Sequence, residues 1–320
     1  MSDYLSESIN DILSIARLAP SVHNSQPWKV KVRKDTLIIL LNRDHILVHG
    51  DPTGRQAYIS LGIFTEACLL ALRHFGFKEV DSRIENEAIV IKVRDKTSIS
   101  NNSDDDIKAL QSRFTDRTVY KKTDFPPESI SRLNACWHSK NVQVYSTSNR
   151  LIIDDCARLT RQALLLAFSN PAFRKELTEH LSPNASVPYG IPLSTLGTTR
   201  VKTLFVKSLI NSGVNRRQEA QTEYKRWMSA SGLVFVLAAG DSKPYWLESG
   251  RAYLRASLEI QKMGLSQATS AAIVEAADFH EDIEKLLDTD KRIQAVIRVG
   301  RGRGKKHPSG RFTAEELLAT

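Results

Sequence analysis

Cysteine is scarce in this chain of 320 residues, where only Cys68, Cys136 and Cys156 occur, far apart from one another. Their number and separation exclude a disulfide framework and a cysteine-rich zinc cluster. The eight histidines do not show metal-ligand spacing either, so we predict no metal site.

Long hydrophobic runs are also missing. The longest, LIILL and LVFVLAA, are too short to cross a lipid bilayer. The first residues, MSDYLSESIND, are polar and acidic, which predicts no secretory signal. We therefore expect a cytoplasmic protein of a reducing compartment with no membrane partner.

The composition is that of a globular protein, with 41% hydrophobic and 25% charged residues. A net charge of +9 favours polyanionic partners such as nucleic acids or a phosphorylated cofactor. The basic residues concentrate in 200–226 and 298–311, but aromatic residues do not interleave with them. Binding of single-stranded nucleic acid needs such stacking platforms, so nucleic acid is a poor candidate partner.

Hydrophobic periodicity predicts that helices and strands both occur along the whole chain. The expected helices cover residues 6–19, 55–74, 106–113, 128–138, 150–169, 216–230, 247–263 and 282–287. The expected strands cover 28–34, 36–42, one or two strands within 84–94, then 142–147, 233–239 and 295–300.

A polar segment, DKTSISNNSDDD at residues 95–106, has the composition of a linker. It divides the chain into an N-terminal half, 1–100, and a C-terminal half, 101–320. The halves share a weak similarity between GRQAYISLGIFTEACLLALRHFGF and GRAYLRASLEIQKMGLSQ. Both segments begin with Gly-Arg and end with glycine before an apolar residue, which indicates an internal duplication.

The segment ARLAPSVHNSQPWKV places several polar side chains in a turn between a helix and a strand. Amide side chains both donate and accept hydrogen bonds, as the edge of a heteroaromatic ring with alternating N–H and C=O groups requires. The alternative is a turn whose side chains satisfy one another. The candidate binding residues here are Pro20, Ser21, His23, Asn24 and Gln26.

A second candidate site is RFTDR, where Arg113 and Arg117 flank Thr115. Guanidinium groups match phosphate oxygens in bidentate geometry, so this pattern suits a phosphate clamp. The alternative is a surface loop with solvated arginines.

APSVHNSQPW strongly resembles the flavin-contacting segment of the nitroreductase family of FMN proteins. Members of that family are usually homodimers. Each FMN lies between an Arg-x-Ser-x-Arg element of one subunit and a Pro-Ser-x-x-Asn element of the other. This chain carries each element once, in different halves. The resemblance therefore implies a fused pseudo-dimer, similar to the Acg-like branch, with two nitroreductase-like half-repeats and one shared FMN site. It also implies an α+β fold, with a mixed, largely antiparallel sheet flanked by helices.

Two later segments add to the resemblance. YGIPLSTLG resembles a loop thought to lie over the flavin, which implies that Gly190 lies near it. SGRF resembles the family's late basic segment that reaches the phosphate, with Arg311 a better candidate than Lys305 or Lys306. GRGRG at 300–304 looks like a dinucleotide fingerprint, but too little chain follows it for a βαβ unit, so a glycine turn is expected.

The resemblance implies an FMN-dependent oxidoreductase in which NAD(P)H reduces nitroaromatic or quinone-like acceptors through FMN. The cofactor performs this chemistry, so His23 is expected near the flavin and no residue is assigned a catalytic role. The alternative is a protein that binds and sequesters FMN under a covering loop, with little turnover. As a pseudo-dimer, the chain would be a monomer or a further homodimer.

Overall fold

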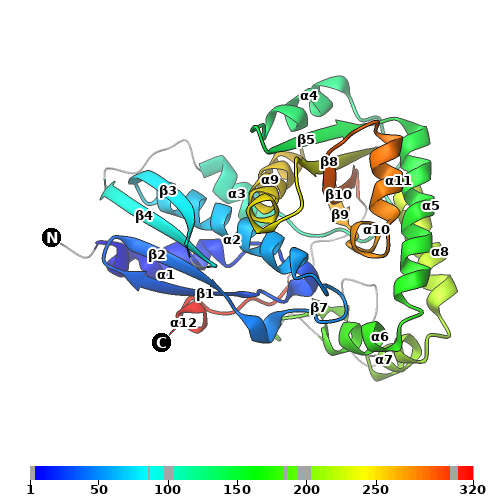
Figure 1. Ribbon diagram of the computed structural model, residues 1–320, viewed down its shortest axis with the longest axis horizontal. Coiled ribbons are helices and arrows are strands. Elements are labelled where there is room, and N and C mark those ends of the chain that lie inside the picture. Colours follow the sequence, from blue (N-terminus) through cyan, green and yellow to red (C-terminus); the bar gives the residue numbers. More distant parts are fainter. Residues whose placement is uncertain are drawn as a thin grey trace.

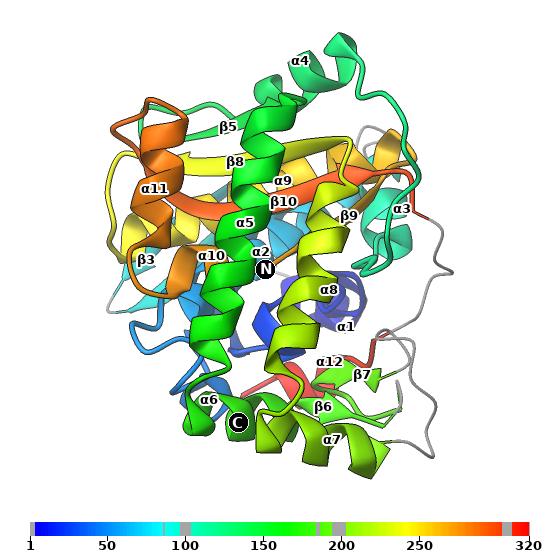
Figure 2. The ribbon, with the colours of Figure 1, turned by 90° about the vertical axis from the view of Figure 1, so that its right-hand side faces the viewer.

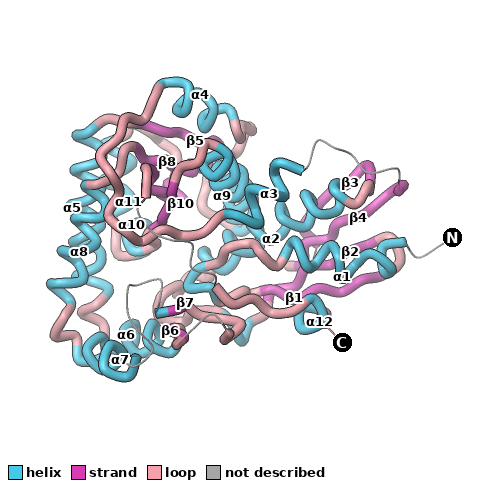
Figure 3. The backbone as a smooth tube through the Cα atoms, turned by 180° about the vertical axis from the view of Figure 1, so that it is seen from behind, coloured by secondary structure: helices cyan, strands magenta, loops and turns pink. Residues whose placement is uncertain are grey.

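The computed structural model describes residues 4–85, 87–96, 104–183, 186–193, 203–302 and 309–319. It confirms the predicted α+β class. Eight of the described strands form two four-stranded antiparallel sheets that lie at opposite ends of the molecule, with helices between them and outside them (Figures 1 and 3). Two further short strands form a separate parallel pair.

The helices of the described residues, in chain order, are α1 (Tyr4–Ala16), α2 (Arg55–His74), α3 (Asp104–Ser112), α4 (Pro127–Ala135), α5 (Arg150–Ala167), α6 (Pro171–Glu179), α7 (Thr203–Ser212), α8 (Arg216–Met228), α9 (Lys243–Lys262), α10 (Ala272–Glu275), α11 (Phe279–Leu286) and α12 (Ala314–Leu317). Two short 3₁₀ turns are η1 (Val22–Asn24) and η2 (Arg43–His45). The strands are β1 (Trp28–Arg33), β2 (Thr36–Leu41), β3 (Phe77–Glu85), β4 (Ala88–Lys96), β5 (Val142–Thr147), β6 (Leu181–Ser182), β7 (Ile191–Pro192), β8 (Gly232–Ala238), β9 (Ser266–Thr269) and β10 (Arg292–Gly300).

The second sheet is covered by helices on both faces, and β8 is buried along its whole length. Leu233, Phe235 and Leu237 join the apolar cluster beneath α5, α8 and α11 on the outer face (Figure 2). The alternate residues, such as Val234 and Val236, join the larger core that both halves share. This two-sided burial explains why the β8 sequence is continuously apolar, whereas β1 alternates.

The two sheets repeat one topology. Their strand orders, β1-β2-β4-β3 and β5-β8-β10-β9, both follow the pattern first, second, fourth, third in chain order. A helix of 20 residues follows the second strand in each case, α2 in the first half and α9 in the second. Gly76 and Gly264 come soon after these helices, with φ of 84° and 66°.

The register of the repeat differs from the one that the Gly-Arg similarity predicted. Gly54 precedes α2, whereas Gly250 lies within α9, so these two glycines do not occupy equivalent places. Gly62 and Gly250 are the equivalent pair, each at the eighth position of its helix. The Gly-Arg dipeptide does not mark equivalent positions of the repeat, because it lies at the start of the helix in the first half and within the helix in the second.

Helices α2 and α9 touch at these two glycines, between the sheets (Figure 1). A Cβ atom on Gly62 would lie 2.0 Å from the carbonyl oxygen of Leu247, and one on Gly250 would lie 2.0 Å from that of Ile59. Each glycine thus faces the residue three positions before the other, which is the reciprocity of a two-fold contact.

The end of the chain returns to the first half. Ala319 donates its backbone N–H to the carbonyl of Val30 at 2.7 Å, and Leu318 forms a parallel bridge with Val30. The segment 309–319 therefore packs on the N-terminal half although it follows the second sheet in sequence. The expected boundary between residues 100 and 101 lies outside the described residues.

Some elements differ from the sequence expectation. Residues 84–94 belong to two strands, β3 and β4, and the helices α6 and α7 were not predicted. Asn170 begins α6 by accepting the backbone N–H of Ala172, with Pro171 at the first helical position. Among the described helices, none combines the length and hydropathy needed to cross a membrane.

We predict that Gly250→Ala lowers the free energy of unfolding by about 1–3 kcal/mol, because the new methyl group would overlap the Ile59 carbonyl. An unhindered glycine-to-alanine change inside a helix instead stabilises a protein by about 0.5–1 kcal/mol. Chemical denaturation distinguishes the two signs, and an unchanged or raised unfolding free energy would contradict the close contact.

Candidate functional site

A cavity of about 680 Å³ is lined by residues of both halves, a size typical of small-molecule sites. Pro20, Ser21 and His23 line it from the first half, and Thr115 and Arg117 from the second. The structure therefore brings together the two segments that the sequence singled out, although about 90 residues separate them.

The segment 20–26 has an unusual backbone. His23, Asn24 and Gln26 have φ of 47°, 56° and 50°, values that side-chain-bearing residues rarely adopt. The turn is held by Ser21, whose Oγ accepts the Gln26 N–H at 2.9 Å. Such conformations cost free energy and concentrate at functional sites.

The Asn24 side chain is buried and fully engaged within the protein. Its Nδ2 donates to the carbonyls of Gly190 and Gly310, both at 3.0 Å, and its Oδ1 accepts from Nη1 of Arg311 at 2.7 Å. Both amide hydrogens are therefore used. In the structure Asn24 thus positions Arg311 and the backbone around Gly190, and its expected contact with the edge of a flavin ring stays a prediction.

Gln26 has the same kind of role. Its side chain, which is fully buried, donates from Nε2 to the Pro188 carbonyl at 2.8 Å, and its Oε1 accepts the Phe312 N–H at 3.2 Å. Asn24 and Gln26 thus tie the segment 20–26 to two distant ones, 188–190 and 310–312. Buried amides need such partners, and sequence alone did not show which segments would supply them.

Gly190 is required at its position for two reasons. Its φ is +85°, and a Cβ atom there would lie 2.6 Å from the His180 carbonyl oxygen. Its N–H donates to the Asn24 carbonyl at 3.2 Å, so it lies beside the predicted segment. The remainder of the expected covering loop, residues 194–197, lies outside the described residues.

Arg17, Arg113 and Arg311 form a basic cluster in which Arg113 is buried and the other two are half-buried. Burial, followed by the positive charges of Arg113 and Arg17, lowers the pKa of Arg311 to about 9, so it stays charged at neutral pH. The Nε atoms of all three are buried without a hydrogen-bond partner. Within the described part of the chain, no carboxylate pairs with Arg113 or Arg311.

A buried cation without a counter-ion is costly, so this cluster is suited to an anion. It includes Arg113 and Arg311 as the sequence predicted, together with Arg17, which sequence reasoning missed. The only early signal for Arg17 was its place four residues before Ser21, in a helix end with no pattern of its own.

Arg117 lies in different surroundings from Arg113. Burial lowers the pKa of Arg117. The negative charge of Glu223 opposes this lowering, and the positive charge of Arg226 adds to it. Arg117 lines the cavity, together with Glu223 and Arg226. The predicted clamp of Arg113 and Arg117 is therefore divided: Arg113 joins the basic cluster, and Arg117 faces the cavity.

Arg298 of β10 fixes the backbone around Arg117. Its side chain is 1% exposed, donates to the carbonyls of Asp116 at 3.0 Å and Thr118 at 3.2 Å, and lies 4.2 Å from the centre of the Tyr120 ring. Sequence reasoning counted Arg298 only among the basic residues of the C-terminal region. Nothing in its local pattern indicated this internal role.

His23 is neutral at physiological pH. Burial, with smaller contributions from His180 and Arg117, lowers its pKa from 6.5 to about 3. Its ring centre lies 6.3 Å from that of His180, and its Nδ1 is buried without a partner. The side chain therefore offers the cavity an uncharged ring with an unused nitrogen.

Tyr253 of α9 also lines the cavity and was not predicted. Burial raises the pKa of its hydroxyl, and the charges of Arg113 and Arg117 oppose that rise. Tyr253 therefore lies close enough to both Arg113 and Arg117 for their charges to act on its hydroxyl. Its sequence position indicated only the buried face of a helix.

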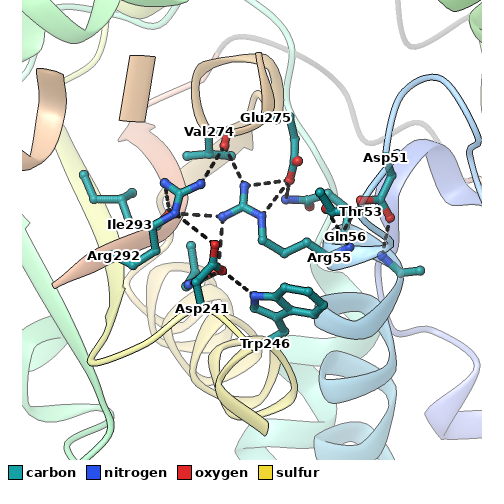
Figure 4. A network of polar contacts seen from close by, with 12 residues as sticks. Asp51, Thr53, Arg55, Gln56, Asp241, Trp246, Val274, Glu275, Arg292 and Ile293 are labelled. Carbon is teal, nitrogen blue, oxygen red and sulfur yellow. Dashed lines mark hydrogen bonds and ion pairs between the residues drawn. The ribbon is translucent and has the colours of Figure 1, made fainter. Parts of the chain in front are cut away.

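A polar network joins the halves beside the cavity (Figure 4). Arg55, which is 2% exposed, donates to Glu275 at 2.6 Å and to the Val274 carbonyl at 2.7 Å, and Gln56 donates to the same carboxylate at 2.6 Å. Because Val274 and Glu275 line the cavity, the network holds one cavity wall against the start of α2.

Asp51 anchors the other side of this network. Its carboxylate accepts the backbone N–H groups of Gln56 at 3.0 Å and Ala57 at 2.8 Å. Burial is the largest cause that raises its pKa to about 7, against the opposing effect of these hydrogen bonds.

Curated relatives confirm the resemblance to the nitroreductase family and its Acg-like branch. The chain is 26% identical over 176 residues to "Putative NAD(P)H nitroreductase Rv3131" of Mycobacterium tuberculosis. The aligned region is 54% of this chain and half of that relative. The chain is 22% identical over 303 residues to "Putative NAD(P)H nitroreductase acg" of the same organism, 91% of this chain and 88% of the relative.

No protein-family model matches the chain. Among solved structures, it is similar to a nitroreductase with bound FMN from Desulfitobacterium hafniense, at 13% identity and a TM-score of 0.41, over 64% of this chain and 93% of that one. A nitroreductase from Sphigopyxis gives 11% identity and a TM-score of 0.42, over 67% and 98%.

We predict that His23→Asn makes the protein less sensitive to acid. The folded-state pKa of about 3 lies below the unfolded value of 6.5, so the unfolded state binds a proton first and stability is lost as the pH falls below 6.5. At pH 5 this loss amounts to about 2 kcal/mol relative to pH 8. Asparagine tolerates the positive φ and does not titrate.

The measurement is the free energy of unfolding of both proteins between pH 8 and pH 5. The wild type should lose more stability over this range than His23→Asn. Parallel curves would show that His23 is not buried as a neutral ring.

Proposed function

Since the chain resembles the Acg-like nitroreductases, we propose that it binds one FMN between its two halves and acts as an NAD(P)H-dependent oxidoreductase on nitroaromatic or quinone-like acceptors. In this proposal residues 1–100 and 101–320 are the two fused half-repeats. The chain is then a pseudo-dimer with a single site.

One observation carries the proposal above the others. In a cluster of three arginines, Arg17, Arg113 and Arg311, the last two have no carboxylate partner among the described residues, and the cluster lies beside a cavity lined by the two predicted motifs. A ligand that carries both an anionic group and a large ring system satisfies both features, and FMN has this composition.

The residues present fit this cofactor. The arginine cluster would hold the phosphate through charge-assisted hydrogen bonds, using the unpaired Nε atoms. Ser21, His23, Thr115 and Arg117 would surround the rest of the molecule in the cavity. When bound, FMN supplies the hydride-transfer chemistry between nicotinamide and acceptor.

The protein's own contribution is orientation and charge. Arg117 and Tyr253 place a fixed positive charge and a neutral hydroxyl at the cavity wall. His23 remains uncharged and adds no competing proton donor at neutral pH. Positive charge at this wall would stabilise negative charge that develops on a reduced ring system.

We predict that Arg113→Ala and Arg311→Ala each weaken FMN binding by about tenfold or more. Each change removes a charge-assisted hydrogen bond of roughly 1.5–3 kcal/mol. Riboflavin lacks the phosphate, so its affinity should change much less. Arg43→Ala is the matched control, because the Arg43 side chain is 73% exposed and is not among the residues that line the cavity.

The affinities are measured by titrating each flavin into flavin-free protein and following flavin fluorescence. Equal weakening of FMN and riboflavin would show that the arginines hold the fold and not a phosphate. That result would remove the main support for the cofactor site.

A second function, FMN sequestration with little turnover, is supported by the segment 187–193. Gln26 and Asn24 hold this segment through Pro188 and Gly190, and Ile191 lines the cavity. A segment fixed over the cavity would prevent a nicotinamide ring from stacking on the flavin. NADPH oxidation, measured with and without a nitroaromatic acceptor, separates the two: steady turnover supports the enzyme, and flavin binding without turnover supports sequestration.

A further inference from the structure

One wall of the cavity is apolar and belongs to neither motif. It is formed by α5, α6 and α7, which extend beyond the second sheet (Figure 2). Its apolar residues are Leu164, Leu166, Ala167, Phe168, Phe173, Leu177, Val206, Leu209 and Ile210. We call these residues the apolar wall. Among the described residues that line the cavity, the three helices contribute no charged side chain.

The apolar wall is arranged in stripes along its helices. Leu164 and Phe168, Phe173 and Leu177, and Val206 and Ile210 are pairs spaced by four residues, so each pair lies on one face of its segment. Three segments thus present apolar pairs to one cavity. A flexible aliphatic chain can lie across several such pairs in turn.

The wall is only partly buried. All the side chains of the three pairs are of intermediate exposure, and Leu166 is 47% exposed. By contrast, residues of the neighbouring core, such as Ile153 on the same helix α5, are fully buried. Apolar area left open in a cavity is covered when an apolar ligand binds, and that covering favours binding.

We propose that the apolar wall binds the aliphatic tail of an uncharged quinone, the electron acceptor of this site. The proposal rests on the proposed function and specifies its substrate class. The missing charge along the wall excludes an acidic or basic tail, because a charged group would lose its hydration without gaining a partner.

The aliphatic tail takes no part in the chemical reaction, which occurs at the quinone head group. The quinone takes up two electrons and two protons and becomes a hydroquinone. Reduced nicotinamide supplies a hydride, which is two electrons and one proton, and solvent supplies the second proton. The tail serves only to bind and orient the quinone.

The test is a series of quinones with one head group and saturated tails of increasing length, reduced by the FMN-loaded protein with NADPH. Each methylene that reaches the wall should lower KM by up to about fourfold, with little change in kcat. Leu166→Gln and Leu209→Gln should flatten this dependence of KM on tail length.

Leu151→Gln is the matched control, since Leu151 is 74% exposed on the same helix as Leu166 and does not line the cavity. It should retain the wild-type dependence on tail length. Turnover whose KM is independent of tail length would overturn the tail site and leave the proposed function intact. Equal flattening in Leu151→Gln would also overturn it.

A binding measurement separates the two proposals. Titration calorimetry of the long-tailed quinone into the wild type and Leu209→Gln does not depend on turnover. If the wild type binds the long-tailed quinone more tightly than Leu209→Gln does, the tail site is supported. If the same wild type oxidises no NADPH, the proposed enzyme activity is rejected while the tail site stands. Equal binding by both proteins overturns the tail site.

Discussion

The contact between Gly62 and Gly250 is the constraint on which the rest of the structure depends. It allows two 20-residue helices to approach until backbone meets backbone, with α2 buried along nearly its whole length and α9 buried on the face that meets it. Larger side chains here would separate the halves. The segments around Ser21 and Thr115 come from different halves, and they reach one cavity because this contact fixes how the halves meet.

The site retains charge and strain that a purely structural core would avoid. Arg113 and Arg311 have no carboxylate partner among the described residues, and three residues of the nearby turn, His23, Asn24 and Gln26, have positive φ. Each feature costs stability. Asn24 and Gln26 offset part of this cost by joining three distant segments through satisfied amides. We infer that the anionic group of a ligand provides the counter-charge that Arg113 and Arg311 lack.

Much of the fold could be predicted from local patterns. The alternation in β1 and the long apolar run of α2 gave those elements to within a residue, because periodicity reflects which face is buried. The helices α6 and α7 were missed since their sequences are short and flank segments rich in Pro, Gly and Ser. The motif residues were singled out by their residue types together with the resemblance to the nitroreductase family, and their contact with a cofactor stays a prediction. The partners of Asn24, the cluster with Arg17 and the role of Arg298 depend on contacts between segments far apart in the sequence, which no local pattern encodes.

The central claim is that one chain builds one flavin site from both halves. Native mass spectrometry of the purified protein measures it directly, since a single spectrum counts the chains and the bound flavins together. The account predicts as many FMN molecules as chains, whether the species is a monomer or a dimer. Two flavins per chain, one flavin shared by two chains, or bound FAD in place of FMN would contradict it.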